Sequence, residues 1–203
     1  MVLITCENIH SHKSSVKLLL VAVYRLLRTC PGRAPTGIRN RALIVVGYRA
    51  GLRLAEALAL HPKDLHREAA TIAVLHGKGN RARTVGLDPA AFSLIERWID
   101  VRASRGINGR APLFCTLDGQ SLMTAYVRAL LPRLALKAGI EKRVHFHGLR
   151  HTMAAELARE GQPMNLIQAQ LGHSSLATTS RYLNHIAPRE LIAAMKAREW
   201  AGV

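Results

Sequence analysis

Two short strand-like segments stand next to each other in a chain that is otherwise patterned for helices, and this contrast limits the folds available to it. Residues 70–75 are mostly apolar and rich in β-branched side chains, and a second expected strand covers 81–85. The turn residues Gly-Lys-Gly-Asn at 77–80 separate the two runs and predict a β-hairpin. The chain is therefore expected to be mainly α-helical with a small antiparallel sheet, an α+β fold.

The helices are predicted from apolar residues at helical spacing and from residues that favour helix ends. Residues 15–29 follow a 3.6-residue period and stop before Pro31-Gly32. A buried helix is predicted from 36 to Gly51, and Asp88-Pro89 predicts a capped helix start. The helix that starts at Asp88-Pro89 is expected to continue to about residue 105. Further helical segments are expected at 53–56, from 121 with a kink or break at Pro132, and at 147–160, 163–171, 175–183 and 188–200.

Length and hydropathy indicate one domain. Residues 1–14 show no periodicity and are expected to be a disordered lead, whereas 15–203 fit a single domain. No apolar run approaches the ~20 residues that a membrane span needs, so the protein is expected to be soluble and cytoplasmic. The three cysteines are scattered and odd in number, which argues against a disulfide framework and favours reduced thiols: Cys6, Cys30 and Cys115.

The charge of the chain indicates its partner. Lys and Arg number 29 against 13 Asp and Glu, which gives a formal charge of +16. An excess of this size in one domain favours nucleic acid as the partner. The less specific alternative is a ribosome-associated or merely soluble basic protein.

Basic and imidazole side chains in the last third of the chain form a candidate anion site. His147 and Arg150 are three residues apart at a predicted helix start, where the helix N-terminus adds partial positive charge. Further on, Tyr182 lies nine residues after His173. A tyrosine hydroxyl with an unperturbed pKa of ~10 needs a base or a cationic setting to act as a nucleophile, and is otherwise a core or interface group.

Two other features have weaker functional signals. Arg53 has Glu56 three residues later, a spacing that lets the carboxylate orient the guanidinium but is also common in surface pairs worth a few tenths of a kcal/mol. Lys78 lies in the glycine-flanked turn, where it is either simply solvated or able to reach DNA. The turn lacks the glycine spacing of a P-loop, which argues against nucleotide binding.

A metal site is the alternative for the histidines. His145, His147 and His151 have a spacing that ligands can adopt, but the nearest carboxylates, Glu141 and Glu156, have no clear ligand spacing. We therefore expect no metal.

Taken together, these motifs resemble the catalytic domain of the tyrosine recombinases, the phage-integrase family related in mechanism to type IB topoisomerases. The resemblance covers roughly residues 36–187 and depends on several elements in the same order. These are Gly51-Leu52-Arg53 with Glu56, Lys78, His147-x-x-Arg150, Leu171-Gly172-His173-Ser174, and Thr178-Thr179 shortly before Tyr182.

The resemblance implies a role for each residue. Arg53 and Arg150 would hold the scissile phosphate, and Tyr182 would attack it to leave a 3′-phosphotyrosyl link. Lys78 would protonate the departing 5′ oxygen, His147 would act as base toward the tyrosine, and His173 would donate a hydrogen bond to the phosphate. Glu56 would support Arg53. Such a reaction needs neither metal nor ATP.

Two departures from the family pattern qualify these expectations. Only about fifty residues precede Arg53, so the N-terminal DNA-clamping domain of the family is expected to be absent. Phe146 also stands where the family often has proline before the histidine, which predicts a shifted helix entry with the catalytic set intact.

The sequence therefore predicts a site-specific DNA recombinase or integrase catalytic domain of bacterial or phage origin. Its partners would be double-stranded DNA, further copies of itself in a higher-order complex, and accessory DNA-binding proteins. A strand nicker and resealer like a minimal topoisomerase is the alternative within the same mechanism. The alternative from another class is a DNA-binding module or a truncated, recombination-incompetent fragment.

Overall fold

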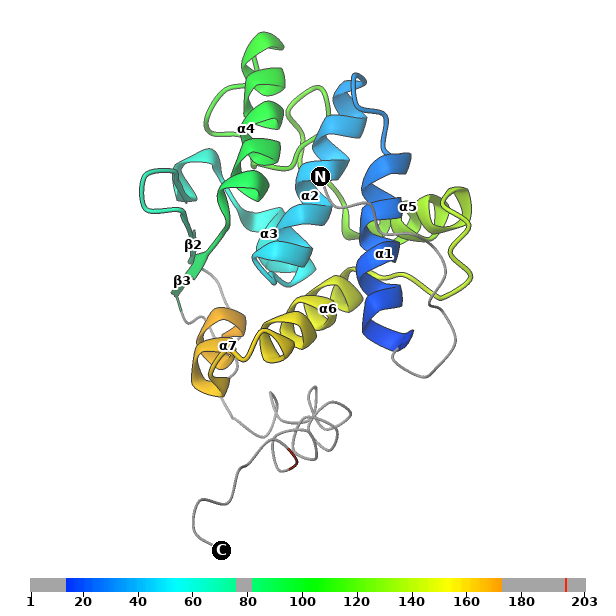
Figure 1. Ribbon diagram of the computed structural model, residues 1–203. Helices are drawn as coiled ribbons and strands as arrows, with labels where there is room; N and C mark the ends of the chain where they lie inside the picture. Colours follow the sequence, from blue (N-terminus) through cyan, green and yellow to red (C-terminus); the bar gives the residue numbers. More distant parts are fainter. Residues whose placement is uncertain (1–13, 76–81, 173–195, 197–203) are drawn as a thin grey trace, which may run out of the picture.

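The computed structural model describes residues 14–75 and 82–172, together with Lys196. Helices make up most of this part, and a small sheet lies at one side (Figure 1). In chain order the elements are α1 (Ser14–Thr29), α2 (Pro35–Arg49), α3 (Leu54–Ala59), the 3-10 turn η1 (Pro62–Asp64), β1 (Leu65–His66), β2 (Thr71–Val74), β3 (Arg83–Gly86), α4 (Pro89–Ser104), α5 (Thr124–Lys137), α6 (Phe146–Arg159) and α7 (Met164–Leu171). The predicted α+β class is confirmed. None of the helices in these residues is long and apolar enough to cross a membrane.

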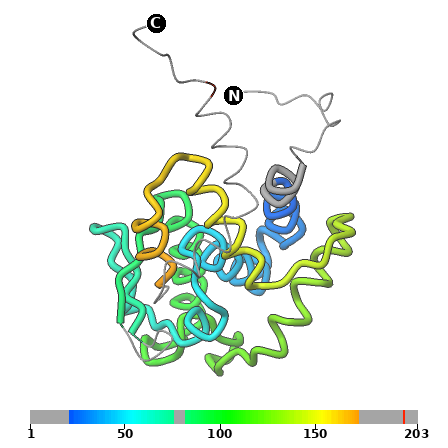
Figure 2. Tube along the Cα trace, turned by 90° about the horizontal axis from the view of Figure 1, so that it is seen from below, coloured from blue at the N-terminus to red at the C-terminus, as the bar shows by residue number. Residues whose placement is uncertain are grey.

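Helix α2 is the centre of the fold. Most of its side chains are buried, among them Leu43, Ile44 and Val46. Helices α4 and α6 pack against it, and α1 lies beside α5 and α6 (Figures 1 and 2). A helix that is apolar around its circumference must be covered by neighbours, so the prediction of a buried helix here is confirmed. After Arg49 the chain turns at Gly51, whose φ of +66° suits glycine.

The sheet has three antiparallel strands in the order β1-β2-β3, one more than predicted. The hairpin of β2 and β3 is confirmed, with Ile72 opposite Val85. Strand β1 was missed because two residues are too few to show a periodicity. Ile72, Val74 and Val85 are buried, so one face of the hairpin faces the core. The turn with Lys78 lies outside the described residues.

Several predicted boundaries need correction. Helix α1 begins at Ser14, one residue inside the predicted disordered lead. Helix α5 begins at Thr124 instead of 121, because Ser121 pairs with Cys115 in an isolated β-bridge and is therefore extended. The same helix continues through Pro132 without a break. The helices predicted at 175–183 and 188–200 lie outside the described residues, apart from Lys196.

Phe146 determines where α6 meets α2. Its ring is buried, and a Cβ atom on Gly47 of α2 would lie only 2.7 Å from its Cζ. Glycine at this point lets the ring contact the backbone of α2. Phe146 thus anchors the N-terminal end of α6, which carries His147 and Arg150.

Asp88 caps helix α4 as predicted, since its Oδ1 accepts a hydrogen bond of 3.0 Å from the N–H of Ala91. Its Oδ2 accepts a hydrogen bond of 2.8 Å from Arg49 Nε, which is solvent-accessible. We expect Asp88→Ala to lower the free energy of unfolding by ~1 kcal/mol through loss of the cap. Asp88→Asn keeps a capping oxygen and should lose only a few tenths through the weakened ion pair. Urea unfolding measures both; equal losses would show that the cap does not contribute.

Candidate active site

The buried guanidinium of Arg150 joins two helix ends. It donates hydrogen bonds to the carbonyl oxygen of Gly51, just after α2, and to that of Leu171, the last residue of α7, the latter at 2.5 Å. Arg150 as a whole is 0% exposed to solvent. Carbonyl groups at helix C-termini lack partners within the helix and carry partial negative charge. Arg150 therefore satisfies these groups while they offset the burial of its charge.

Arg53 is bound to Glu56, so the carboxylate does orient the guanidinium, the first of the two alternatives that the spacing left open. Its Nη1 donates to Glu56 Oε1 at 2.7 Å, and its backbone N–H donates to Oε2 at 2.8 Å. The carboxylate therefore both orients the guanidinium and satisfies an N–H group at the start of α3. The exposed fraction is 3% for the Glu56 side chain and 25% for that of Arg53. This is a shielded pair rather than a surface pair.

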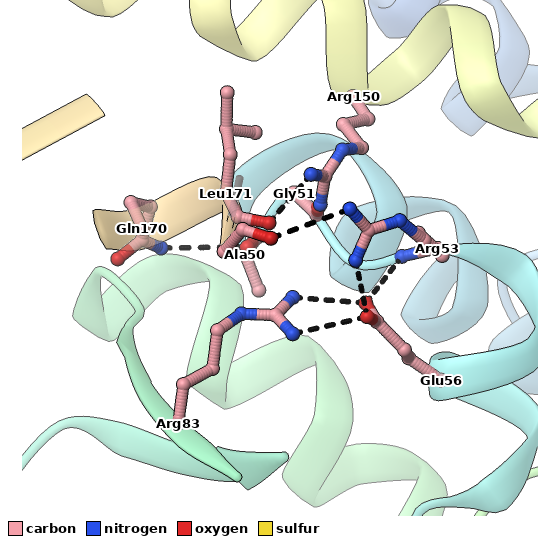
Figure 3. A network of polar contacts seen from close by, with 9 residues as sticks. Ala50, Gly51, Arg53, Glu56, Arg83, Arg150, Gln170 and Leu171 are labelled. Atoms are coloured by element: carbon pink, nitrogen blue, oxygen red, sulfur yellow. Dashed lines mark hydrogen bonds and ion pairs between the residues drawn. The ribbon is translucent and has the colours of Figure 1, made fainter. Parts of the chain in front are cut away.

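A second arginine, which the sequence analysis missed, binds the same carboxylate. Arg83 of β3 donates from Nη1 to Glu56 Oε1 at 3.0 Å and from Nη2 to Oε2 at 2.9 Å (Figure 3). A signal for this pair exists in the sequence. Arg83 and Val85 share a face of β3, and Val85 faces the core. A charged residue on a core face calls for a buried partner.

The charge of Glu56 is fixed by its partners. Burial alone would raise the pKa of its carboxyl, but hydrogen bonds and positive charge from Arg83 and Arg53 outweigh burial and lower the pKa from 4.5 to about 2. Glu56 is therefore ionised across the physiological range, and the cluster of Arg53, Glu56 and Arg83 carries a net positive charge.

Gly172 brings the end of α7 into this cluster. Its φ of +63° is a conformation that favours glycine, and a Cβ atom at this position would lie 2.6 Å from Cδ of Arg83. Its carbonyl oxygen accepts a long hydrogen bond of 3.4 Å from Arg53 Nη2. The side chain of Gln170 exchanges two hydrogen bonds with the backbone of Gly86, at 3.0 and 2.9 Å. Helix α7 is thus attached to both β3 and Arg53.

His147 lies in the first turn of α6, within electrostatic reach of Arg150 and Arg53. Partial desolvation, followed by the positive charges of Arg150, His145 and Arg53, lowers the pKa of His147 below its ordinary 6.5. Its ring also meets that of His151 edge to face, with centroids 4.5 Å apart. At neutral pH His147 is therefore an uncharged imidazole that can accept a proton.

The predicted site residues divide into two groups. The structure brings Arg53, Glu56, His147 and Arg150 together, whereas Lys78, His173 and Tyr182 lie outside the described residues. Within residues 14–75 and 82–172, no three His, Cys, Asp or Glu side chains are grouped so that they could hold a metal ion. The histidines of the metal alternative, His145, His147 and His151, form no such group.

A hollow beside the site has a basic rim. It is lined by side chains from α3, α5, α6 and the segment before α6, which are Leu54, Val127, Arg128, Pro132, Arg143, Val144, His145 and Phe146. Leu54 directly follows Arg53 in the sequence, so this hollow is near the arginine cluster. Arg128, Arg143 and His145 are exposed, and the two arginines add positive charge to the same side.

Comparison with solved structures defines the class of fold. The XerA recombinase superposes with a TM-score of 0.76 at 30% identity, over 88% of this chain and 64% of that one. The XerH site-specific recombinase bound to difH substrate gives 0.71 at 31% identity, over 88% and 53%. The catalytic domain of bacteriophage HP1 integrase shares the fold, with a TM-score of 0.59 at 24% identity, over 88% and 92%. The fold is that of tyrosine recombinase catalytic domains.

Sequence comparison agrees. The profile of the Phage integrase family matches residues 18–189. Tyrosine recombinase XerC of Xanthomonas axonopodis pv. citri (strain 306) is 35% identical over 152 residues, which are 75% of this chain and 48% of that protein. XerC of Escherichia coli O157:H7 is 34% identical over 148 residues, 73% of this chain and 49% of that protein. The chain belongs to the phage integrase family and spans about half the length of these relatives.

The lowered pKa of Glu56 generates a prediction for stability. A carboxyl whose pKa falls on folding stabilises the protein above the unfolded pKa, and this contribution is lost as the pH falls from 4.5 toward about 2. The difference in free energy of unfolding between wild type and Glu56→Gln should therefore shrink by roughly 2 kcal/mol from pH 6 to pH 3.

Denaturant unfolding at each pH measures this difference. Glu96→Gln is the control, because Glu96 pairs with an arginine whose side chain is 79% exposed and should change stability little. A Glu56→Gln difference that stays constant with pH would show that Arg53 and Arg83 do not hold the carboxylate as described.

Proposed function

We propose that this chain is the catalytic part of a site-specific DNA recombinase that cleaves and rejoins strands of double-stranded DNA. The observation that supports this most strongly is that an uncharged His147 lies within electrostatic reach of both Arg150 and Arg53, and that the buried carboxylate of Glu56 orients Arg53. Two guanidinium groups match the oxygens of a phosphodiester, and a neutral imidazole beside them can accept a proton. This set of groups suits phosphoryl transfer to a hydroxyl nucleophile.

In the proposed reaction the hydroxyl oxygen of Tyr182 attacks the scissile phosphorus, and the bond from phosphorus to the 5′ oxygen breaks. His147 takes the tyrosine proton, and Lys78 gives a proton to the leaving 5′ oxygen. Arg53 and Arg150 stabilise the extra negative charge of the pentacoordinate transition state, with His173 donating a further hydrogen bond. The 3′-phosphotyrosyl bond conserves the energy of the phosphodiester, so the reverse steps rejoin a strand without ATP.

The charge distribution supports DNA as the substrate. The chain carries +16 overall, and the basic rim of Arg128, Arg143 and His145 lies next to the first turn of α6. Contacts to the phosphate backbone supply most of the affinity of such surfaces and make binding salt-dependent. DNA running over the rim would bring a phosphate toward Arg53.

The relatives suggest the setting in which this chemistry takes place. XerH has been solved in pre-cleavage and post-cleavage complexes with difH DNA, and the Tn1549 transposon integrase in complex with a circular DNA intermediate. By analogy, we place this chain in the cytoplasm, acting on DNA of a chromosome or mobile element, in a higher-order complex of several copies with accessory DNA-binding proteins.

The competing functions share the fold but differ in chemistry. A DNA-binding module or a recombination-incompetent fragment would bind DNA without forming a covalent bond. A topoisomerase-like nicking and resealing enzyme would form the bond but exchange no strands. Covalent trapping separates the first of these alternatives from the proposed function.

We expect a covalent 3′ complex when the protein is incubated with a pool of nicked duplexes of randomised sequence, from which the cleaved strand end is lost by diffusion. Denaturing electrophoresis detects the complex, with excess EDTA present throughout. Tyr182→Phe should form none. Arg150→Ala should cost ~3 kcal/mol or more in the cleavage barrier, as expected when a transition-state charge donor is lost, with DNA binding much less affected.

Two results would contradict the proposal. If Tyr182→Phe still forms the covalent complex, Tyr182 is not the nucleophile. A requirement for magnesium or zinc would instead favour metal-assisted chemistry.

The state of His147 gives the reaction a pH dependence. Because the pKa of His147 lies below its ordinary 6.5, the imidazole is mostly unprotonated at pH 7. The single-turnover rate of covalent complex formation should therefore be level near pH 7 and decline only at more acidic pH. His147→Gln should be slower and lack this acidic decline. If the rate of the variant declines in the same way at acidic pH, the decline comes from the protonation of a group other than His147.

A further inference from the structure

We propose that Arg83 is a positioning residue for strand cleavage: it offsets the charge of Glu56, so that Arg53 keeps its positive charge for the phosphate. This inference rests on the proposed function, since it assigns Arg83 a part in the same site. Arg83 was not among the residues expected from the sequence, and its role follows from the contacts of one carboxylate.

The geometry makes Arg83 the main partner of Glu56. Both terminal nitrogens of Arg83 donate to the carboxylate, one to each oxygen, at 3.0 and 2.9 Å. The guanidinium of Arg53 donates to this carboxylate through Nη1 alone, at 2.7 Å to Oε1, and the backbone N–H of Arg53 donates to Oε2 at 2.8 Å. Such two-point guanidinium pairing is the strongest arrangement available to a carboxylate. Arg83 therefore holds Glu56 in place, while the other terminal nitrogen of Arg53 points to the carbonyl of Gly172 at 3.4 Å.

Charge balance explains why a second arginine is needed. A shielded pair of Arg53 and Glu56 is neutral overall and a poor receptor for a phosphate. With Arg83 added, the three groups carry a net charge of +1. The side chains of Glu56 and Arg83 are only 3% and 12% exposed, so water screens their charges weakly. Within the described residues, Glu56 is the only acid bonded to either arginine.

Arg83 also supports the chain next to Arg53. The Cα of Gly172 approaches Arg83 so closely that a Cβ there would lie 2.6 to 2.9 Å from Cδ, Nε and Cζ. The carbonyl of the same Gly172 accepts the long hydrogen bond from Arg53. Arg83 thus contacts both groups that bind the Arg53 guanidinium, which are the carboxylate of Glu56 and the backbone of Gly172. Arg83 itself is not expected to contact the phosphate.

A variant cycle separates this electrostatic role from a purely structural one. Arg83→Gln leaves Glu56 to neutralise Arg53 and should weaken anion binding about tenfold, the effect of losing one nearby charge. Glu56→Gln removes the opposing charge and should bind at least as tightly as wild type. The double variant Arg83→Gln/Glu56→Gln leaves Arg53 with no opposing acid and should recover to within about threefold of wild type.

The probe is inorganic phosphate at low ionic strength and pH 7, and the readout is the 15N–1H signals of the Arg53 side chain in each protein. Circular dichroism and melting verify that each variant is folded. The readout does not require cleavage, so the inference can succeed or fail separately from the covalent trapping of DNA. Tyr182→Phe serves as a control that should bind phosphate as wild type does.

Three outcomes would overturn the inference. These are Arg53 signals in wild type that do not respond to phosphate, an Arg83→Gln protein that binds as wild type does, and a folded double variant as weak as Arg83→Gln. If Arg83→Gln does not fold, Glu56→Gln is compared with the double variant, because neither has a buried unpaired acid. Glu56→Gln should then bind about tenfold more tightly, and equal affinities would again overturn the inference.

Discussion

The buried guanidinium of Arg150 is the interaction on which the arrangement of the site depends. It extends from α6 and donates to the carbonyl groups of Gly51 and Leu171, at the ends of α2 and α7. Arg150 lies 99 residues from Gly51 and 21 residues from Leu171 in the sequence, and its side chain brings these helix ends together. A cation at two helix C-termini is favourable on both sides, because the carbonyl groups need donors and the buried charge needs negative partners.

The small sheet has a function that its size does not suggest. Strand β3 carries Arg83 on its core-facing side, where it binds Glu56, and Gly86 at its end, where it pairs with Gln170 of α7. The sheet thus fixes the carboxylate behind Arg53 and the helix that precedes His173. In the same way, Phe146 fixes the first turn of α6 against Gly47 of α2. Among the described side chains proposed to contact phosphate, Arg53 and Arg150 both donate hydrogen bonds to the backbone of other elements.

Local interactions were the part of this structure that the sequence predicted. Asp88 capping α4, the turn at Gly51 and the pair of Arg53 with Glu56 all involve residues a few positions apart. A contact between distant segments was missed, since Arg83 lies 27 residues from Glu56. The bridge of Ser121 to Cys115, which delays the start of α5, was also missed, because an isolated bridge produces no periodicity in the sequence. The roles of Lys78, His173 and Tyr182 stay predictions from the family resemblance.

The account requires that Arg150 assembles the site before DNA binds, and amide hydrogen exchange in the absence of DNA tests this most directly. Arg150→Met keeps much of the side-chain volume but removes the donors to Gly51 and Leu171. We expect the amides of α7 and of Gly172, which donates to Gln168 and Ala169, to exchange at least about tenfold faster in the variant, with α4 unchanged. Unchanged exchange in α7 would contradict the account, because the helix end would then be held without Arg150.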